Sequence, residues 1–354
     1  MTEYSYDRFD LDKALLPVWK AGVIYHESVM FMEGEEEARL MLPAEEIYEV
    51  RSPDLQTVYT EGRDYVLRDG SIVRCPGSRI PVMPLAEYYP DHASAPEGSW
   101  FGADVPGRQA ILYSEQPVFF SRQPGVTYRP AAPWTGPVPQ KEPRLERFVR
   151  KAFGGETARI VYFGDSITTG RNSSSWMGCP PYAPAWYDMV TARLRLLTGN
   201  SRIETVNTAE NGEDSRWACQ HIDDRVAAFA PDLLVYAFGM NDGAKSPEEF
   251  MDLTCRSLDR VRALCPRCEV LLIAPMLPHR RVKGFWGNQR LFYDVMKSRT
   301  AGREHTGLVP VTGIHEYMLR RKEYYHTTGN NVNHPNDFLS RIYARAVLDV
   351  LTDP

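Results

Sequence analysis

The stretch Val161-Tyr162-Phe163-Gly164-Asp165-Ser166-Ile167-Thr168-Thr169-Gly170 carries the strongest structural signal in this sequence. The apolar run over residues 158–163 is typical of a buried β-strand, and it ends at a glycine. Ser166 follows two residues after that break. The pattern predicts a hydroxyl group at the carboxyl end of a strand, where open α/β sheets bind their ligands. A serine there can attack a carbonyl carbon if a base removes its proton and donors stabilise the oxyanion.

Strands and helices are predicted to alternate along the rest of this half of the chain. Further apolar runs that indicate buried strands cover residues 203–207, 233–238, 270–274 and 308–311. Helical spacing of apolar residues marks residues 215–229 and 338–346, and Ser246-Pro247-Glu248-Glu249 has the residues of a capped helix start. Because this alternation repeats five times, we expect a doubly wound parallel sheet with helices on both faces.

The first part of the chain has a different pattern. Residues 24–128 contain short alternating segments and many turn residues, and residues 65–73 predict two strands joined at Asp-Gly. Residues 111–113 and 118–120 are further predicted strands. A proline-rich stretch over residues 129–139 reads as a semi-rigid linker. We therefore expect a β-rich domain, sandwich-like or jelly-roll-like, over residues 1–140 and an α/β domain over residues 141–354.

Composition excludes several classes of partner. The 354 residues include 41 Lys and Arg against 46 Asp and Glu, for a net charge of −5. Without a basic block, we expect no nucleic-acid partner and no binding to an anionic membrane.

The start of the chain lacks the pattern of a secretory signal, so a cytoplasmic location is expected. The six cysteines are scattered, and Cys265-Pro266-Arg267-Cys268 has no second pair to complete a zinc site, so we expect no metal and no cofactor.

Four short motifs are predicted to meet at one edge of the sheet, since each lies at the carboxyl end of a strand or in a loop beside it. They are Gly164-Asp165-Ser166, Asn207-Thr208-Ala209-Glu210-Asn211-Gly212, Phe238-Gly239-Met240-Asn241-Asp242 and Asn333-His334-Pro335-Asn336-Asp337. Ser166 is the candidate nucleophile, and His334 is the candidate base that takes its proton. The N–H groups of Ser166 and Gly212 and the side-chain amide of Asn241 can together form an oxyanion hole.

These motifs, in this order, resemble those of the SGNH (GDSL-type) hydrolases, a family of esterases and acetyl-esterases. The resemblance covers roughly residues 150–354. It implies a flavodoxin-like α/β/α sandwich, with Ser166 as nucleophile, Gly212 and Asn241 as oxyanion donors and His334 as base. One position departs from the family, which usually has an Asp three residues before this His, where the present chain has Asn331. An amide cannot stabilise imidazolium by charge. The third member therefore stays open between Asn331, a main-chain oxygen and a carboxylate from elsewhere.

The sequence thus predicts a serine esterase that removes small acyl groups, acetyl first among them, from a carbohydrate through an acyl-enzyme. The carbohydrate part rests on the resemblance and on Trp176, Phe285 and Trp286, loop aromatics that can form a sugar-binding wall. A lipid or aryl ester hydrolase and a carbohydrate-binding protein with decayed catalysis are the alternatives. The expected partner is a small-molecule or oligosaccharide ester. Homo-oligomerisation stays open, as does the part that the N-terminal domain plays: sugar-binding module, active-site wall or oligomer interface.

Overall fold

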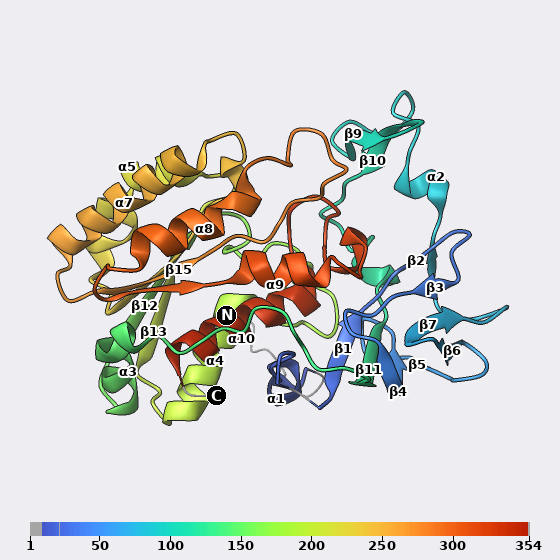
Figure 1. Cartoon of the computed structure of the whole chain (residues 1–354), viewed down its shortest axis with the longest axis horizontal. Helices are drawn as coiled ribbons and strands as arrows, with labels where there is room; N and C mark the ends of the chain where they lie inside the picture. The colour runs from blue at the N-terminus through green and yellow to red at the C-terminus, as the bar shows by residue number, and fades with distance from the viewer. Residues whose placement is uncertain (1–8, 21, 353–354) are drawn as a thin grey trace.

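A five-stranded parallel sheet organises the second half of the chain in the computed structural model, which describes residues 9–20 and 22–352 (Figure 1). Its order is β13-β12-β14-β15-β16, and every neighbouring pair is parallel. The strands are β12 (Ala158–Gly164), β13 (Ile203–Asn207), β14 (Leu233–Ala237), β15 (Glu269–Ile273) and β16 (Thr306–Val309). All five predicted strands are confirmed within two residues at each end. Since β13 and β14 lie on opposite sides of β12, the strand order reverses at β12, which is where such sheets bind ligands.

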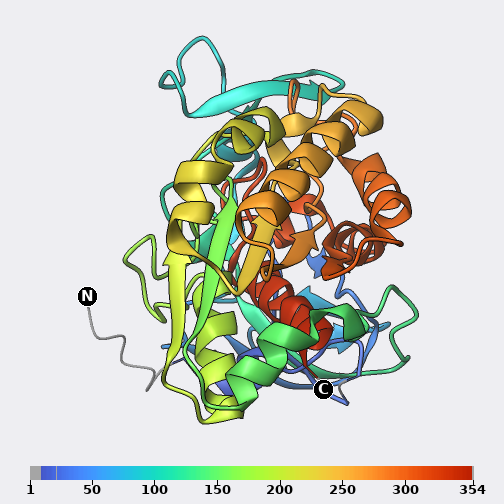
Figure 2. The ribbon, with the colours of Figure 1, turned by 90° about the vertical axis from the view of Figure 1, so that its left-hand side faces the viewer.

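Helices cover both faces of this sheet, as the alternation of strands and helices predicts. In Figure 1, α5, α7 and α8 lie above the sheet, and α4 and α10 lie below it. Figure 2 faces this half of the molecule, with the N-terminal strands behind it. The side chains of β12 divide between the two faces: Ile160 and Tyr162 belong to the core under α4 and α10, whereas Val161 and Phe163 belong to the core under α7 and α8. The fold is therefore the α/β/α sandwich that the family resemblance implies.

Most helix boundaries follow local signals in the sequence. The helices of this half are α3 (Glu146–Phe153), α4 (Trp186–Thr198), α5 (Ser215–Gln220), α6 (Ile222–Arg225), α7 (Pro247–Leu264), α8 (Gln289–Thr300), α9 (Val311–Met318) and α10 (Asp337–Leu351), with short 3-10 turns η2 (Pro143–Leu145), η3 (Ala227–Phe229), η4 (Met240–Asp242) and η5 (Tyr324–His326). The predicted start of α7 is confirmed, because Ser246 accepts a hydrogen bond from the N–H of Glu249. The single helix predicted over residues 215–229 is wrong. His221 and Val226 leave the helical conformation and divide that segment into α5, α6 and η3.

The first half of the chain forms a sandwich-like domain of short strands. One sheet has the order β1-β11-β4-β5, a second has the order β3-β7-β6, and two strand pairs, β2-β8 and β9-β10, complete the set. The strands are β1 (Ile24–Ser28), β2 (Phe31–Met32), β3 (Glu37–Ala38), β4 (Ala44–Arg51), β5 (Val58–Tyr59), β6 (Tyr65–Arg68), β7 (Ser71–Arg74), β8 (Val82–Met83), β9 (Trp100–Val105), β10 (Arg108–Leu112) and β11 (Gly125–Pro130), with short helices α1 (Leu11–Ala14), α2 (Leu85–Tyr88) and η1 (Phe120–Arg122).

Two sequence predictions in this half have opposite outcomes. The hairpin at Asp69-Gly70 is confirmed, since it joins β6 to β7 with φ values of 51° and 75°, the left-handed pair that a tight hairpin turn requires. The strand predicted over residues 118–120 is wrong. Those residues lie in a helical turn that leads into η1, where the N–H of Ser121 donates to the carbonyl of Pro117. Phe119 and Phe120 are buried by this turn and not by strand pairing.

The two halves share buried polar contacts. Lys322, which precedes η5, pairs with Glu27 of β1, and neither side chain has any exposed surface. Trp19 donates its indole N–H to Asp349 of α10, at 2.7 Å. The proline-rich segment runs beside α9, where the rings of Trp134 and Tyr317 lie 4.3 Å apart. None of the helices within residues 9–20 and 22–352 is long and apolar enough to span a bilayer.

Candidate active site

The loops after β12, β13 and β14 meet at one edge of the sheet. The strands are parallel and in register, so their carboxyl ends lie side by side. Hydrogen bonds then join the loops: the N–H of Glu210 donates to the carbonyl of Gly164 at 3.0 Å, and the side-chain amide of Asn241 donates to the carbonyl of Glu213 at 2.9 Å. Three of the four sequence motifs are therefore brought together at the switch point of the sheet.

Ser166 and His334 are in direct contact. The Nε2 atom of His334 lies 2.8 Å from the Oγ atom of Ser166, and both side chains are buried. The loop that carries His334 is shaped by Asn330, whose Oδ1 accepts hydrogen bonds from the N–H groups of Val332, Asn333 and His334. Burial lowers the pKa of His334 to about 4. The imidazole is therefore neutral at pH 7 and able to accept a proton.

Three N–H donors are available near the serine. Gly212 has a φ of +80°, a backbone conformation that favours glycine. Among the residues that the structure describes, no acceptor faces the N–H of Ser166 or of Gly212. Asn241 uses one amide hydrogen on Glu213, which leaves the second hydrogen for a substrate oxygen. These are the three groups that the sequence singles out as oxyanion donors.

The carboxylates beside these residues hold the loops. Asp165 is buried, and its Oδ1 accepts from the N–H of Ile167 at 2.9 Å. Asp242 is buried too and accepts from the hydroxyl of Ser215 at 2.6 Å and from Lys245 at 2.9 Å. Both side chains point into the protein, so neither is positioned to act on a substrate.

The other ring nitrogen of His334 faces two residues that sequence reasoning missed. Its Nδ1 lies 2.7 Å from the Oδ1 of Asn172 and 3.4 Å from the Oε1 of Glu115. Asn172 donates its amide N–H to the carbonyl of Glu115 at 3.3 Å, so its Oδ1 is the atom turned toward the ring. This arrangement puts the ring proton on Nδ1 and leaves the lone pair of Nε2 toward Ser166. No motif marks Asn172, and Glu115 comes from the loop after β10 in the other half of the chain.

The structure places the side chain of Asn331 elsewhere. Its Oδ1 accepts from the hydroxyl of Tyr88 at 3.1 Å, and its Nδ2 donates to the carbonyl of Leu112 at 3.0 Å. Both contacts are to the N-terminal half. Asn331 has a φ of +70°, and its side-chain oxygen and nitrogen contact Tyr88 and Leu112 and not the ring of His334. The nearest partner of His334 Nδ1, the side chain of Asn172, is none of the three alternatives left open, and a carboxylate from elsewhere, Glu115, lies 3.4 Å from the same atom.

Of the three loop aromatics, Trp176 lies beside the charged residues next to His334. It is 42% exposed, and the guanidinium of Arg171 lies 4.7 Å from the centre of its ring. Arg171 in turn pairs with Glu115. Phe285 packs edge-on against Phe101 of β9, at 4.9 Å. Trp286 lines a groove of about 720 Å³ whose lining does not include Ser166, Gly212, Asn241 or His334. The side-chain amide of Gln289 donates to the carbonyls of Phe285 and Met240, at 2.8 and 3.0 Å, so Phe285 lies beside the loop that carries Asn241.

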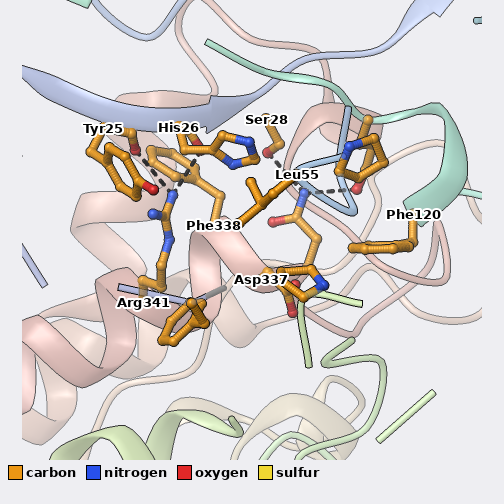
Figure 3. Close-up of a pocket in the computed structure, with 13 residues that line it drawn as sticks. Tyr25, His26, Ser28, Leu55, Phe120, Asp337, Phe338 and Arg341 are labelled. Atoms are coloured by element: carbon orange, nitrogen blue, oxygen red, sulfur yellow. Dashed lines mark hydrogen bonds between the residues drawn. The ribbon is translucent and has the colours of Figure 1, made fainter. Parts of the chain in front are cut away.

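A smaller pocket of about 40 Å³ lies between β1 and α10 (Figure 3). Arg341 reaches from α10 to the carbonyls of Tyr25 and His26, at 3.1 and 2.8 Å. At its other side, Asp337 accepts from the N–H of Ser174 at 2.8 Å, and burial raises the pKa of Asp337 to about 6. Ser166 and His334 do not line this pocket. In the described part of the chain, no group of His, Cys, Asp and Glu side chains is arranged to hold a metal ion.

A search of curated proteins found no match. A two-domain esterase active on acetylated mannans, co-crystallised with mannopentaose, has 19% identity and a TM-score of 0.47, with 60% of this chain and 54% of that chain covered. The present chain therefore spans about half the length of that esterase. An α/β hydrolase from the metagenome of Lake Arreo, Spain, has 20% identity and a TM-score of 0.44, covering 54% of this chain and 93% of that chain. The acetylxylan esterase Axe2 from Geobacillus stearothermophilus has 17% identity and a TM-score of 0.45, covering 54% and 92%.

The family assignment rests on the sequence itself. The model of the GDSL-like lipase/acylhydrolase family matches residues 162–341, about half of the chain. That range begins in β12, four residues before Ser166, and ends in α10, after His334. The protein therefore belongs to the GDSL-like lipase/acylhydrolase family.

Proposed function

We propose that this protein removes acetyl groups from a carbohydrate ester through an acyl-enzyme, with Ser166 as nucleophile and His334 as base. The observation that carries the proposal is the 2.8 Å contact between the Oγ of Ser166 and the Nε2 of His334, at the sheet edge where the candidate oxyanion donors meet. A neutral imidazole in contact with a serine hydroxyl is the arrangement that activates the hydroxyl for attack.

The reaction then has two halves. The Oγ of Ser166 attacks the carbonyl carbon of the acetyl ester as its proton passes to the Nε2 of His334. The negative oxygen that forms is stabilised by the N–H groups of Ser166 and Gly212 and the amide of Asn241. The intermediate collapses, the bond to the sugar oxygen breaks, and that oxygen takes the proton from His334. Water then attacks acetyl-Ser166, again losing a proton to His334, and acetic acid leaves as the proton returns to Ser166.

The surroundings of Ser166 support a small acyl group on a polar substrate. The hydroxyl of Thr169 donates to the side chain of Asn211 at 2.9 Å, and Arg171 and Glu115 form an ion pair beside the histidine. A long acyl chain would have to lie against these polar groups, which is unfavourable. Exposed Trp176 at the same rim offers an aromatic face on which a sugar ring can stack.

A substrate panel tests the proposal. Acetate release from acetylated xylo- and manno-oligosaccharides is compared with hydrolysis of p-nitrophenyl acetate, butyrate and octanoate, with Ser166→Ala as the inactive control. We expect acetate release from the oligosaccharides, rates that fall with acyl length, and loss of all hydrolysis in Ser166→Ala. Faster hydrolysis of the octanoate ester would indicate a lipid or aryl esterase instead. Failure of a covalent serine probe to label the wild-type protein would indicate decayed catalysis.

The sugar-binding part has its own test. Trp176→Ala is expected to raise KM for acetylated oligosaccharides by roughly tenfold, because the binding free energy of one aromatic contact corresponds to about that factor. The kinetics on p-nitrophenyl acetate should stay unchanged. Equal effects on both substrates would mean that Trp176 supports the loop and does not bind sugar.

A further inference from the structure

We propose that Glu115, supplied by the N-terminal half, is the positioning carboxylate of His334 and acts together with Asn172. The inference rests on the proposed roles of Ser166 and His334. Asn172 provides the short hydrogen bond to the Nδ1 of His334, at 2.7 Å, and Glu115 provides a negative charge at 3.4 Å from the same atom. The two functions that one aspartate combines in a Ser-His-Asp triad are thus divided between two side chains.

A charge is needed at this point because the histidine is buried. Burial disfavours the imidazolium form, which holds the pKa of His334 near 4. Imidazolium must nevertheless form each time Ser166 gives up its proton. A carboxylate close to Nδ1 favours that form, and among the described residues Glu115 is the carboxylate that raises the pKa of His334. Asn172 is neutral and cannot replace this contribution.

Each carboxylate oxygen of Glu115 has its own partner. Its Oε1 accepts from the hydroxyl of Tyr113 at 2.8 Å, and its Oε2 pairs with Arg171. Its own carbonyl accepts from the amide of Asn172, so the carboxylate and the amide approach the ring as one unit. The Glu115 side chain is only 21% exposed, which limits screening by water. Ordered contacts of this kind are typical of a group that must keep its distance to a partner.

Arg171 is the opposing charge. It lowers the pKa of His334 and, through its ion pair, offsets part of the charge of Glu115. Tyr113 is the other titratable group in contact with Glu115, and it is neutral at pH 7, since burial and then hydrogen bonding to Glu115 raise its pKa. The balance at the ring therefore depends on Glu115 and Arg171, and these two can be changed separately.

The structural alternative is that Glu115 only anchors Arg171 and the loop after β10. The two roles differ in their effect on proton affinity. If Glu115 acts by charge, Arg171→Gln unscreens the carboxylate and raises the pKa of His334, and removing Glu115 as well cancels that rise. If Glu115 is only an anchor, Arg171→Gln still raises the pKa of His334, because the guanidinium charge is gone, but removing Glu115 as well does not cancel that rise.

The experiment measures how fast a fluorophosphonate labels Ser166 between pH 4 and 9. In this reaction the Oγ–P bond forms, fluoride leaves, and the serine proton passes to His334 and on to solvent, so no sugar substrate is needed. Wild type is compared with Glu115→Gln, Arg171→Gln and the double variant. Glu87→Gln is the matched control, because Glu87 forms an ion pair with Arg122 at 2.8 Å in the same half of the chain.

Glu115→Gln is expected to lower the labelling rate at pH 7 by about 10²-fold, less than the ~10⁴-fold of a neutralised triad aspartate because Arg171 already offsets part of the charge. Arg171→Gln is expected to move the acid limb upward by about one pH unit, and the double variant to remove that shift. Glu87→Gln should behave as wild type.

Two results would overturn the inference. One is a rate in folded Glu115→Gln within twofold of wild type; the other is the same acid limb in Arg171→Gln and in the double variant. Suppose that wild type is labelled and the variants show the expected shifts of the acid limb, while wild type releases no acetate from sugars. In that case only the proposed substrate is wrong. Absence of labelling in wild type would overturn both proposals.

Discussion

Replacing Asn331 with alanine should destabilise the fold far more than it slows ester hydrolysis. Asn331 is fully buried, and its side chain satisfies the hydroxyl of Tyr88 and the carbonyl of Leu112. Alanine leaves both groups without a partner, at about 1–2 kcal/mol each after partial relaxation. It also places a Cβ-bearing residue without a polar side chain at φ +70°, for about 1 kcal/mol more. The expected loss is about 3–5 kcal/mol of unfolding free energy.

The catalytic effect should be much smaller. The Nδ1 of His334 keeps its contact with Asn172, so kcat is expected to stay within roughly an order of magnitude of wild type. Urea unfolding followed by tryptophan fluorescence gives the stability, and kcat on p-nitrophenyl acetate is measured where the variant is fully folded. Asn331→Gly separates the terms, since it removes the left-handed strain and should recover about 1 kcal/mol relative to alanine.

A different pattern would refute this reasoning. If Asn331→Ala reduced kcat as severely as His334→Ala while leaving the unfolding free energy unchanged, the side chain of Asn331 would have to act on the imidazole. The contacts to Tyr88 and Leu112 would then be incidental, and Asn331 would take the place of the usual aspartate.

Three further outcomes are expected. Asn241→Ala should lower kcat on p-nitrophenyl acetate by about 10²–10³-fold with little change in KM, as for loss of one oxyanion donor, and a pure KM effect would assign Asn241 to substrate binding. The base must be neutral, and burial holds the pKa of His334 at about 4, so kcat/KM should persist at pH 6 and fall only as the pH drops through about 4; an acid limb near 6.5 would contradict this. Lys322→Met should cost about 3–5 kcal/mol in urea unfolding, because it leaves Glu27 buried without its cation, and Lys322→Met/Glu27→Gln should recover part of that loss; unchanged stability in Lys322→Met would contradict the assignment.

The second half of the fold could be predicted from the sequence because its signals are local. Each buried strand is a short apolar run, and the α7 start needs only neighbouring residues to form. In the first half, the Asp69-Gly70 turn is local in the same way. The contact between Ser166 and His334 could also be predicted from the sequence. Both residues belong to motifs at strand ends or loops beside them, and parallel strands bring such ends to one edge.

Contacts between the halves could not be predicted in this way. Glu115 has no periodicity or motif around it, and its distance to His334 depends on how the loop after β10 packs on the α/β half. The same packing takes Asn331 away from the ring. Local propensity also failed at residues 118–120, where burial of Phe119 is achieved by a helical turn as well as it would be by a strand.

The position of Asn331 and the proposed role of Glu115 have a common structural origin. The loop before α10 is shaped by Asn330, which binds three consecutive N–H groups and so fixes the backbone of His334 without help from position 331. Position 331 is then free to bind the N-terminal half, and it does so through Tyr88 and Leu112. Leu112 is the last residue of β10, three residues before Glu115. The contact that removes Asn331 from the histidine therefore holds the strand that delivers Glu115 to it. If Glu115 positions His334 as proposed, the N-terminal half completes the wall of the active site.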